Sequence, residues 1–374
     1  MNTPGTDFIP AAKPVIGDEE KRLVLEVLES GQLSLGQKTL AFEQGMADRV
    51  GVAYGRATSS GTAGLHLALR AAGVREGDQV ITSPMSFIAS ANSVLFERAV
   101  PRFVDVDPVT FNLDVDAAAD AITPKTKALL PVHIFGYPAD TPALERHGLP
   151  IVEDACEAVG AIHADGTPVG GRGHSAVFAF YANKQIATGE GGMVVTSEQR
   201  VADLIASERN QGRAADMGWL DHDRLGFNYR MSELQAALGV AQLGRLDQML
   251  ADRAQVAAWY RAALADLADR GLGLPCADRG QERRGWFVFV VQVPDGTDRD
   301  DTIRALTADG IQCRPYLPPI HLFSFYRDLG YREGMFPVTE RIGASSLALP
   351  FFPQMTQGQV EHVAARLRHH LLGH

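Results

Sequence analysis

The sequence has few cysteines, no excess of positive charge and no long apolar run. Its three cysteines are far apart and form no CxxC pair, so we expect neither a disulfide framework nor a zinc or redox motif, and we predict a reducing, cytoplasmic location. The net charge of −10 argues against general nucleic-acid binding, which needs a basic surface. No apolar stretch approaches the roughly 20 residues that span a bilayer, and residues 1–12 lack a signal-peptide pattern, so we predict no membrane association.

The composition is typical of a large globular protein. The chain has 374 residues, 45% of them hydrophobic and 21% charged, which allows a sizeable core and about two domains. We predict a large domain over residues 1–250 and a smaller C-terminal α/β domain over residues 251–374. The adjacent His369 and His370 near the C-terminus face different directions on a helix, so we expect a solvated helix end there and no metal site.

Short apolar runs alternate with helical patterns along the first two-thirds of the chain. A capping box at Ser232 and Gln235 also marks the start of a helix. This alternation predicts an α/β fold with a mostly parallel central sheet and helices on both faces, in which ligands bind beyond the carboxyl ends of the strands. The runs predict strands at residues 79–82, 102–106, 128–132, 150–153, 176–180 and 193–196. The helical patterns cover residues 18–30, 62–72, 86–97, 115–122 and 199–208.

Lys184 and Asp154 each stand at the end of a predicted strand. Lys184 follows an aromatic run and precedes a Gly-Glu-Gly-Gly loop at residues 189–192. An isolated lysine is usually a solvated side chain, but a lysine paired with an upstream carboxylate fits the chemistry of pyridoxal phosphate (PLP). The lysine forms a Schiff base with PLP, and the carboxylate keeps the pyridinium nitrogen protonated. Asp154 also fits a helix cap, and both roles can hold at once.

A small Ser/Gly/Thr cluster opens the predicted helix at residues 62–72. Backbone N–H groups at a helix N-terminus, together with hydroxyl groups, make a phosphate cradle. Simple capping by Thr62 is the alternative, and the position of the cluster ahead of the strand–helix series favours the phosphate role. The candidate phosphate-binding residues are Ser60, Gly61, Thr62 and Ala63.

Other candidate site residues lie in three separate segments. Phe87 could stack on the cofactor ring or pack in the core, and Asn228 could bind the phosphate across a dimer interface or simply form a turn. A proline-stiffened loop at residues 314–321 could hold Arg314, Tyr316 and His321 towards a substrate, or act only as a rigid connection.

Taken together, these segments resemble the DegT/DnrJ/EryC1/StrS family of sugar aminotransferases. The resemblance extends from about residue 9 to residue 367 and rests on six motifs in the family's order and at family-like spacing. The motifs are Ser-Ser-Gly-Thr-Ala at 59–63, Phe-Val-Asp-Val-Asp at 103–107, Pro-Val-His at 131–133 with Gly136, Glu-Asp-Ala at 153–155, Lys184 with residues 189–192, and Gly-Phe-Asn-Tyr-Arg-Met at 226–231.

The resemblance implies a fold type I PLP-dependent transferase, similar to aspartate aminotransferase, and a homodimer with shared active sites. Lys184 would be the Schiff-base lysine and Asp154 the partner of the pyridinium nitrogen. Thr62 and Ala63 would hold the phosphate, and Asn228 would reach the phosphate of the partner subunit.

The resemblance also identifies an aromatic partner for the cofactor and two departures from the family pattern. Phe87 would stack on the ring, where relatives often carry an aromatic residue.

Many relatives have serine in place of Ala179, so this chain lacks the hydroxyl that would make one of the phosphate contacts. Relatives commonly have glutamine or histidine in place of Glu157, near the phenolic oxygen of the cofactor. A carboxylate beside an oxyanion is repulsive unless one is protonated, so we expect Glu157 to affect protonation there or to turn to another donor.

Lys184 also points to transamination, because a branch of the family with histidine at this position dehydrates sugars. The Gly-Glu-Gly-Gly loop resembles the branch that acts at C4 rather than at C3. We therefore expect transfer of an amino group from glutamate to the C4 keto group of a nucleotide-linked deoxysugar. The transfer would use a Lys184 Schiff base and two ping-pong half-reactions, with pyridoxamine phosphate between them.

Three other functions fit the same motifs. The protein could aminate a non-nucleotide cyclic ketone, as in aminocyclitol formation, or could be another fold type I PLP enzyme such as a lyase or desulfurase. It could also be a non-catalytic regulator built on this fold. The presence of both Lys184 and Asp154 weighs against a regulator, since binding alone needs no Schiff-base lysine.

Overall fold

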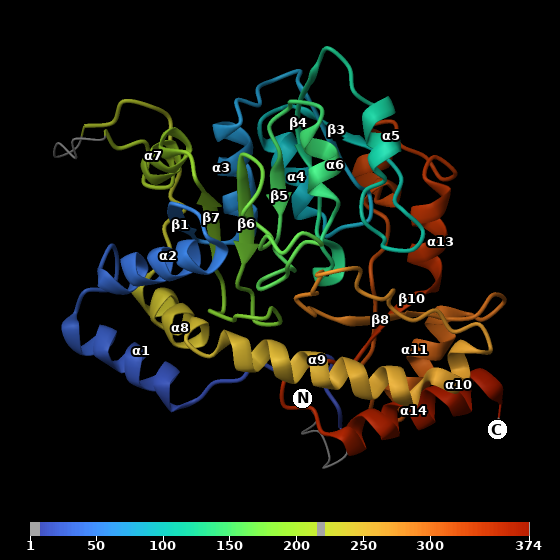
Figure 1. Cartoon of the computed structure of the whole chain (residues 1–374). Helices are drawn as coiled ribbons and strands as arrows, with labels where there is room; N and C mark the ends of the chain where they lie inside the picture. The colour runs from blue at the N-terminus through green and yellow to red at the C-terminus, as the bar shows by residue number, and fades with distance from the viewer. Residues whose placement is uncertain (1–7, 215–220, 374) are drawn as a thin grey trace.

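A central sheet with helices on both faces forms the larger part of the molecule (Figure 1). The computed structural model describes residues 8–214 and 221–373. The strands of this part are β1 (Tyr54–Thr58), β2 (Gln79–Thr82), β3 (Val100–Phe103), β4 (Thr126–Leu130), β5 (Val152–Asp154), β6 (Ser175–Ala179) and β7 (Gly192–Thr196). The helices are α1 (Asp18–Ser30), α2 (Gln37–Val50), α3 (Gly61–Ala71), α4 (Ala89–Phe96), α5 (Val115–Asp120), α6 (Thr141–Glu145), α7 (Gln199–Glu208) and α8 (Glu233–Leu243).

The strands form one continuous layer. Hydrogen bonds give the orders β1-β7-β6-β5 and β3-β2-β4, and parallel bridges from Leu129 to Ile151 and from Val132 to Asp154 join β4 to β5. The pairs β2–β3, β2–β4 and β5–β6 are parallel, whereas β7 runs antiparallel to both β1 and β6. The prediction of a mostly parallel α/β sheet is therefore confirmed, with β7 as the reversed strand.

Both faces of the sheet are buried, which explains the near-continuous apolar runs of its strands. Val177 of β6 packs with residues of α3 and α7 on one face. Its neighbours Ala176 and Phe178 pack with residues of α2 and α8 on the other face, including Phe42. Successive side chains of a strand point to opposite faces, so a strand between two helix layers is apolar along a continuous run, as β6 is from Ala176 to Ala179.

A second, smaller part contains an antiparallel sheet of order β8-β10-β9 against three helices. Its strands are β8 (Phe289–Gln292), β9 (Arg314–Pro315) and β10 (Ser346–Leu349). Its helices are α9 (Leu246–Ala263), α10 (Ala265–Ala268), α11 (Arg299–Ala308), α12 (Ser324–Asp328), α13 (Pro337–Ser345) and α14 (Gln357–Leu372), of which α9, α11 and α14 cover the sheet.

Helix α9 connects the two parts. Leu246 at its start packs in the core beneath the large sheet, and Val256 and Tyr260 further along pack in the core of the small sheet. Ile9 also belongs to this second core and pairs with Ile311. The predicted division at residue 250 thus falls inside one continuous helix, and the division into independent domains stays a prediction.

Local signals place several helix ends. Ser232 caps α8 with the predicted capping box, since its Oγ accepts from Gln235 N–H while its own N–H donates to Gln235 Oε1 at 2.9 Å. The terminal helix α14 extends through His369 and His370, and His370 Nε2 lies 2.6 Å from Asp309 Oδ2. Within residues 8–214 and 221–373, no helix combines the length and the apolar character needed to cross a membrane.

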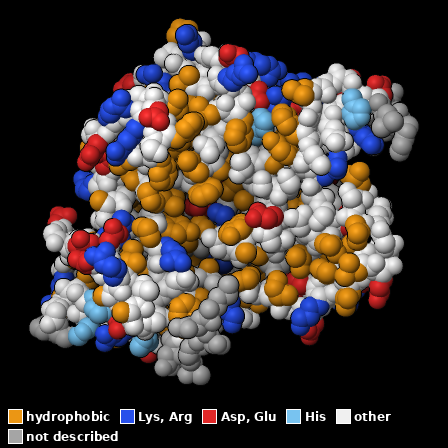
Figure 2. Space-filling view, turned by 180° about the vertical axis from the view of Figure 1, so that it is seen from behind, with side chains coloured by type: hydrophobic (Ala, Val, Ile, Leu, Met, Phe, Trp, Pro, Cys, Tyr) orange, Lys and Arg blue, Asp and Glu red, His pale blue; other side chains and the backbone are white. Residues whose placement is uncertain are grey.

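One face of the molecule carries many hydrophobic side chains around a central hollow (Figure 2). Phe87 and Tyr181 are among the exposed aromatic residues of the protein, at 63% and 52% exposure. Both also line a mostly apolar cavity next to the central sheet. An exposed apolar area of this kind is a common sign of a binding surface.

Candidate active site

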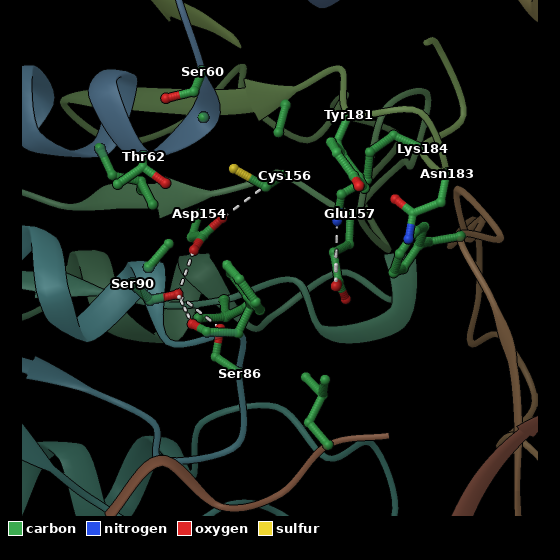
Figure 3. Close-up of a pocket in the computed structure, with 18 of the residues that line it drawn as sticks. Ser60, Thr62, Ser86, Ser90, Asp154, Cys156, Glu157, Tyr181, Asn183 and Lys184 are labelled. Atoms are coloured by element: carbon green, nitrogen blue, oxygen red, sulfur yellow. Dashed lines mark hydrogen bonds and ion pairs between the residues drawn. The ribbon is translucent and has the colours of Figure 1, made fainter. Parts of the chain in front are cut away.

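A cavity of about 370 Å³ lies beyond the carboxyl ends of β5 and β6. Ser60 and Thr62 at the N-terminus of α3 line one side of it (Figure 3). Phe287 and Tyr316 from the smaller part also line it. This is the edge of the sheet at which ligands bind in α/β folds, because side chains from several strand ends and helix starts converge there. The cavity is mostly apolar with a few polar groups, as small-molecule sites usually are.

Asp154 is the last residue of β5 and is buried at the cavity wall. Its Oδ2 accepts a hydrogen bond of 2.6 Å from Ser90 Oγ, and its Oδ1 accepts one of 3.2 Å from Cys156 N–H. Ser90 is in turn 2.7 Å from Ser86 Oγ. The carboxylate is therefore held on both oxygens, by its own loop and by α4.

Lys184 lies in the loop after β6 and directs its amine at two groups. Nζ is 3.4 Å from Glu157 Oε1 and 3.9 Å from the centroid of the Phe287 ring. Glu157 Oε2 accepts a 2.9 Å hydrogen bond from Phe135 N–H. Burial raises the pKa of Glu157 above its usual value, although Lys184 and the Phe135 amide act in the opposite direction. Glu157 thus has two donors within the protein, and its effect on protonation at the cofactor stays a prediction.

Glycines bring the start of α3 close to the strand ends. Ser60 caps this helix by accepting from Ala63 N–H at 3.1 Å. A Cβ on Gly61 would lie 2.7 Å from Ala179 Cβ, and one on Gly192 would lie 2.4 Å from Ser60 O. Neither position has room for a side chain, so the glycines allow the N–H groups of α3 to face the cavity at close range. Ala179 contributes only a methyl group at this point.

Most of the predicted site residues meet in this cavity. Ala63 stands just behind it, with its N–H bonded to Ser60. Asn228 lies elsewhere on an exposed segment that pairs with Asn210. The residues that line the cavity as predicted are Ser60, Gly61, Thr62, Phe87, Asp154, Glu157, Lys184 and Tyr316.

Two of the three substrate candidates do not line the cavity. Arg314 is exposed on β9. His321, in contrast to expectation, is fully buried, and its Nε2 lies 2.9 Å from Glu340 Oε1 while its ring packs against Phe336. The contact of Nε2 with Glu340 holds the imidazole inward, away from the residues that line the cavity.

The structure adds lining residues that the sequence did not single out. Ser86 and Ser90 are four residues apart, a spacing that places them on one side of a helical turn, and this signal was available. Asn183 precedes Lys184 directly. Leu317 belongs to the loop at residues 314–321 that was expected to face a substrate. Phe287 carried no signal, because it belongs to another part of the chain and reaches the cavity only through packing. The other additional lining residues are Leu65, Ala89, Cys156 and Tyr181. Val132, Ala179, Glu190 and Gly191, which belong to segments that the sequence did single out, also line the cavity.

The model of the DegT/DnrJ/EryC1/StrS aminotransferase family matches residues 14–368. The chain belongs to this family. GDP-perosamine synthase of Caulobacter vibrioides is 40% identical over 372 residues, covering 96% of this chain and 97% of that relative. The crystal structure of S. venezuelae DesV is 34% identical with a TM-score of 0.89, covering 94% of both chains. DesI, solved in the presence of its TDP-sugar product, is 32% identical with a TM-score of 0.89, covering 100% of this chain and 95% of its own.

These relatives confirm the fold type I architecture and a PLP-dependent sugar aminotransferase. The cavity of this aminotransferase fits PLP by its chemistry. The N-terminus of α3 suits a phosphate, the Asp154 carboxylate suits a pyridinium nitrogen, and the Lys184 amine suits an aldehyde. Asn183 Oδ1 is buried beside the cavity without a hydrogen-bond partner among the described residues, which leaves an acceptor for a bound polar group.

Proposed function

We propose that this aminotransferase moves an amino group from glutamate to the C4 keto group of a nucleotide-linked deoxysugar. The observation that carries the proposal is that Lys184 and Asp154 line one cavity together with the N-terminus of α3. The names of two relatives, GDP-perosamine synthase and a DesI structure with a TDP-sugar product, support a nucleotide-linked substrate. The Gly-Glu-Gly-Gly loop, in which Glu190 and Gly191 line the cavity, supports the C4 position.

Different residues would bind different parts of the cofactor. Ser60, Thr62 and the first N–H groups of α3 would bind its phosphate, Asp154 its ring nitrogen and Lys184 its carbonyl carbon. Bound PLP supplies an electron sink for the negative charge that develops when the amino donor loses its α-proton. The Lys184 amine would be the base that takes the proton from the donor's α-carbon and delivers it to the cofactor carbon that carried the aldehyde.

The second half-reaction uses the same groups in reverse on the keto sugar. Lys184 again moves the proton. Because the first product leaves before the keto sugar enters, the kinetics are expected to be ping-pong. Tyr316 lines the cavity and is the candidate for orienting the sugar. Arg314 is exposed, and its guanidinium suits the diphosphate of a nucleotide. His321 has no part in this proposal, because its ring is buried against Glu340.

A homodimer with shared active sites is part of the proposal. Phe87 and Tyr181 line the cavity yet are 63% and 52% exposed, and Leu225 near Asn228 is 73% exposed. Hydrophobic side chains surround the hollow on this face (Figure 2). A second copy would cover this apolar surface, and the exposed Asn228 would then be free to reach the partner's phosphate.

We also propose that the protein works in the cytoplasm. Cys156, Cys276 and Cys313 are free thiols, which persist in a reducing compartment.

Size-exclusion chromatography with light scattering would test the proposed homodimer directly, and a strictly monomeric active enzyme would contradict it.

Absorption spectroscopy tests the central assignment. The purified protein with PLP should show a visible band that depends on Lys184 and that glutamate converts to the shorter-wavelength spectrum of pyridoxamine phosphate. Lys184→Ala should lack this band, whereas Lys125→Ala, at an exposed lysine, should keep it. A parent protein without a lysine-dependent band would refute the assignment. A band that ignores glutamate would refute the donor. If glutamate does convert the band, 4-keto sugars carried on GDP or TDP would be offered to the aminated form to test the acceptor.

A further inference from the structure

Asp154 is tied to α4 by a chain of two serine hydroxyls. Ser90, the second residue of α4, lies 2.6 Å from Asp154 Oδ2, and Ser86 Oγ lies 2.7 Å from Ser90 Oγ (Figure 3). All three side chains are at least nine-tenths buried, with exposures of 1% for Ser90, 4% for Ser86 and 4% for Asp154. Water therefore has little access to these groups, so the hydroxyls are the partners on which the Oδ2 side of the carboxylate depends.

The hydrogens in this chain have one consistent direction. An ionised Asp154 carboxylate has no hydrogen to donate and can only accept. The single hydroxyl hydrogen of Ser90 therefore points to Oδ2. Ser90 Oγ is then free to accept from Ser86. The carbonyl oxygen of Phe87, at 3.3 Å from Ser90 Oγ, is a more distant and uncharged competitor for the same hydrogen. A hydrogen bond to a charged acceptor at 2.6 Å is the stronger of the two.

We propose that Ser90, supported by Ser86, is a positioning residue that fixes the Asp154 carboxylate towards the ring nitrogen of the bound cofactor. The inference rests on the proposed function, since it concerns the residue that would pair with PLP. Cys156 N–H holds Oδ1 at 3.2 Å, so without Ser90 the carboxylate would have one longer contact and could rotate about its side-chain bonds. Rotation would misalign the ion pair on which cofactor binding and electron withdrawal depend.

The same turn carries Phe87, which gives the chain a second effect. Phe87 O accepts from Ser90 N–H at 3.2 Å, and its ring lies at the cavity with 63% exposure. Ser86 and Ser90 flank this residue in sequence. The turn therefore links Phe87, whose side chain is expected on the face of the cofactor ring, to Asp154, whose carboxylate is expected at the ring nitrogen.

The test measures PLP binding to the apoprotein by titration, alongside steady-state kinetics and thermal unfolding. Ser90→Ala should weaken PLP binding about tenfold and lower kcat more than it changes the KM for glutamate. Ser90→Thr keeps a hydroxyl and should restore binding. Ser86→Ala, which removes only the distal donor, should shift binding in the same direction by less.

Ser93→Ala is the matched control. Ser93 is on the same helix and fully buried, but its hydroxyl donates to Ser90 O at 2.8 Å and not to Asp154. Its substitution should leave PLP affinity unchanged even if the melting temperature falls. In an Asp154→Asn background, Ser90→Ala should have little further effect on binding, because the charged acceptor is gone.

Three results would overturn the inference. They are parental PLP affinity in Ser90→Ala, an equal loss in Ser93→Ala, and an undiminished Ser90→Ala effect in the Asp154→Asn background. If Ser90→Ala does not fold, unchanged affinity in Ser86→Ala decides against the inference and a reduced affinity there supports it. Failure of the parent itself to bind PLP would instead remove the proposed function, and this inference with it.

Discussion

Lys184 Nζ and Glu157 Oε1 lie 3.4 Å apart although they come from different loops, with side chains only 13% and 8% exposed. The second oxygen of Glu157 is bonded to Phe135 N–H, so the carboxyl group cannot turn away without losing that contact. Lys184 carries the amine that is expected to move the proton, and Glu157 is a titratable group in contact with that amine. Both residues line the cavity. The charge of Glu157 should therefore influence both the stability of the protein and the behaviour of Lys184.

Glu157→Gln should change how stability depends on pH. Burial raises the pKa of Glu157 above 4.5 in the folded apoprotein, outweighing Lys184 and the Phe135 amide. The folded state then holds this proton more tightly than the unfolded state, so the contribution of Glu157 to stability is greatest below pH 4.5 and falls as pH rises through the folded pKa. Glutamine does not titrate, so the free energy of unfolding of Glu157→Gln relative to the parent should increase over that range.

Urea unfolding of the apoprotein at a series of pH values measures this difference. Glu190→Gln is the control, because Glu190 is an exposed carboxylate at the same cavity. A difference between Glu157→Gln and the parent that stays constant with pH would contradict the prediction.

Gly192→Ala should disrupt the phosphate end of the cavity. The added Cβ would lie 2.4 Å from Ser60 O and 2.7 Å from Gly61 N, and these backbone atoms cannot move without shifting the start of α3. We expect a loss of about 1–3 kcal/mol in the free energy of unfolding, together with weaker PLP binding. Gly358→Ala, where no atom lies within 4 Å of the new Cβ, should be close to neutral. Equal effects of the two substitutions in denaturant unfolding and PLP titration would count against the close packing at Gly192.

Arg70→Met should strongly destabilise the helices behind the cavity. Arg70 of α3 donates to Glu208 Oε2 at 2.5 Å and to Glu97 Oε1 at 2.8 Å, and the two carboxylate side chains are only 6% and 9% exposed. Removing the guanidinium would leave both carboxylates buried without their main partner, at a cost of about 3–5 kcal/mol.

Arg98→Met provides the comparison for this network. Arg98 and Glu76 form a pair at 3.3 Å with side chains 78% and 71% exposed, so its loss should cost no more than about 1 kcal/mol. Chemical denaturation of both variants measures the contrast. Similar losses in the two would show that the Arg70 network contributes no more than a surface pair.

His321→Ala should reduce stability rather than substrate affinity. Its ring is fully buried between Glu340 and Phe336, so truncation would remove packing and one hydrogen bond, with an expected loss of about 2 kcal/mol or more. The KM for the keto sugar should stay near the parental value at a temperature where the variant is folded. Tyr316→Phe, at a residue that lines the cavity, should show the opposite pattern of altered kinetics with a small change in melting temperature. A large rise in KM for His321→Ala at full folding would place the imidazole in the substrate site after all.

Much of the fold could be predicted from the sequence because burial leaves a periodic trace. Strand β6 is apolar from Ala176 to Ala179 since Ala176 and Val177 face different helix layers, and the sequence showed this run directly. The cap at Ser232 is a local hydrogen-bond pattern and needs no distant partner. Asp154 stood out as a polar residue at the end of an apolar strand, and Lys184 as a polar residue in the loop that follows the apolar strand β6.

Helix α2 (Gln37–Val50) and the reversed direction of β7 were not predicted. A strand buried on both faces has the same apolar pattern whether it runs parallel or antiparallel to its neighbours, so its direction cannot be read from that pattern. Helix α2 places Phe42 in the core and faces solvent with Leu40 at 56% exposure, which weakens the apolar stripe that would identify a helix.

The sequence by itself determined the layers of the large sheet, the strand end at Asp154, the apolar strand that precedes Lys184, and the family. Only the tertiary structure decided that Phe287 would face the lysine, that Ser90 would hold Asp154, and that His321 would turn inward to Glu340. The physical reason is that periodicity along a chain records which side of an element is buried. Contacts between distant residues depend instead on how those elements pack against one another, and no local pattern records that.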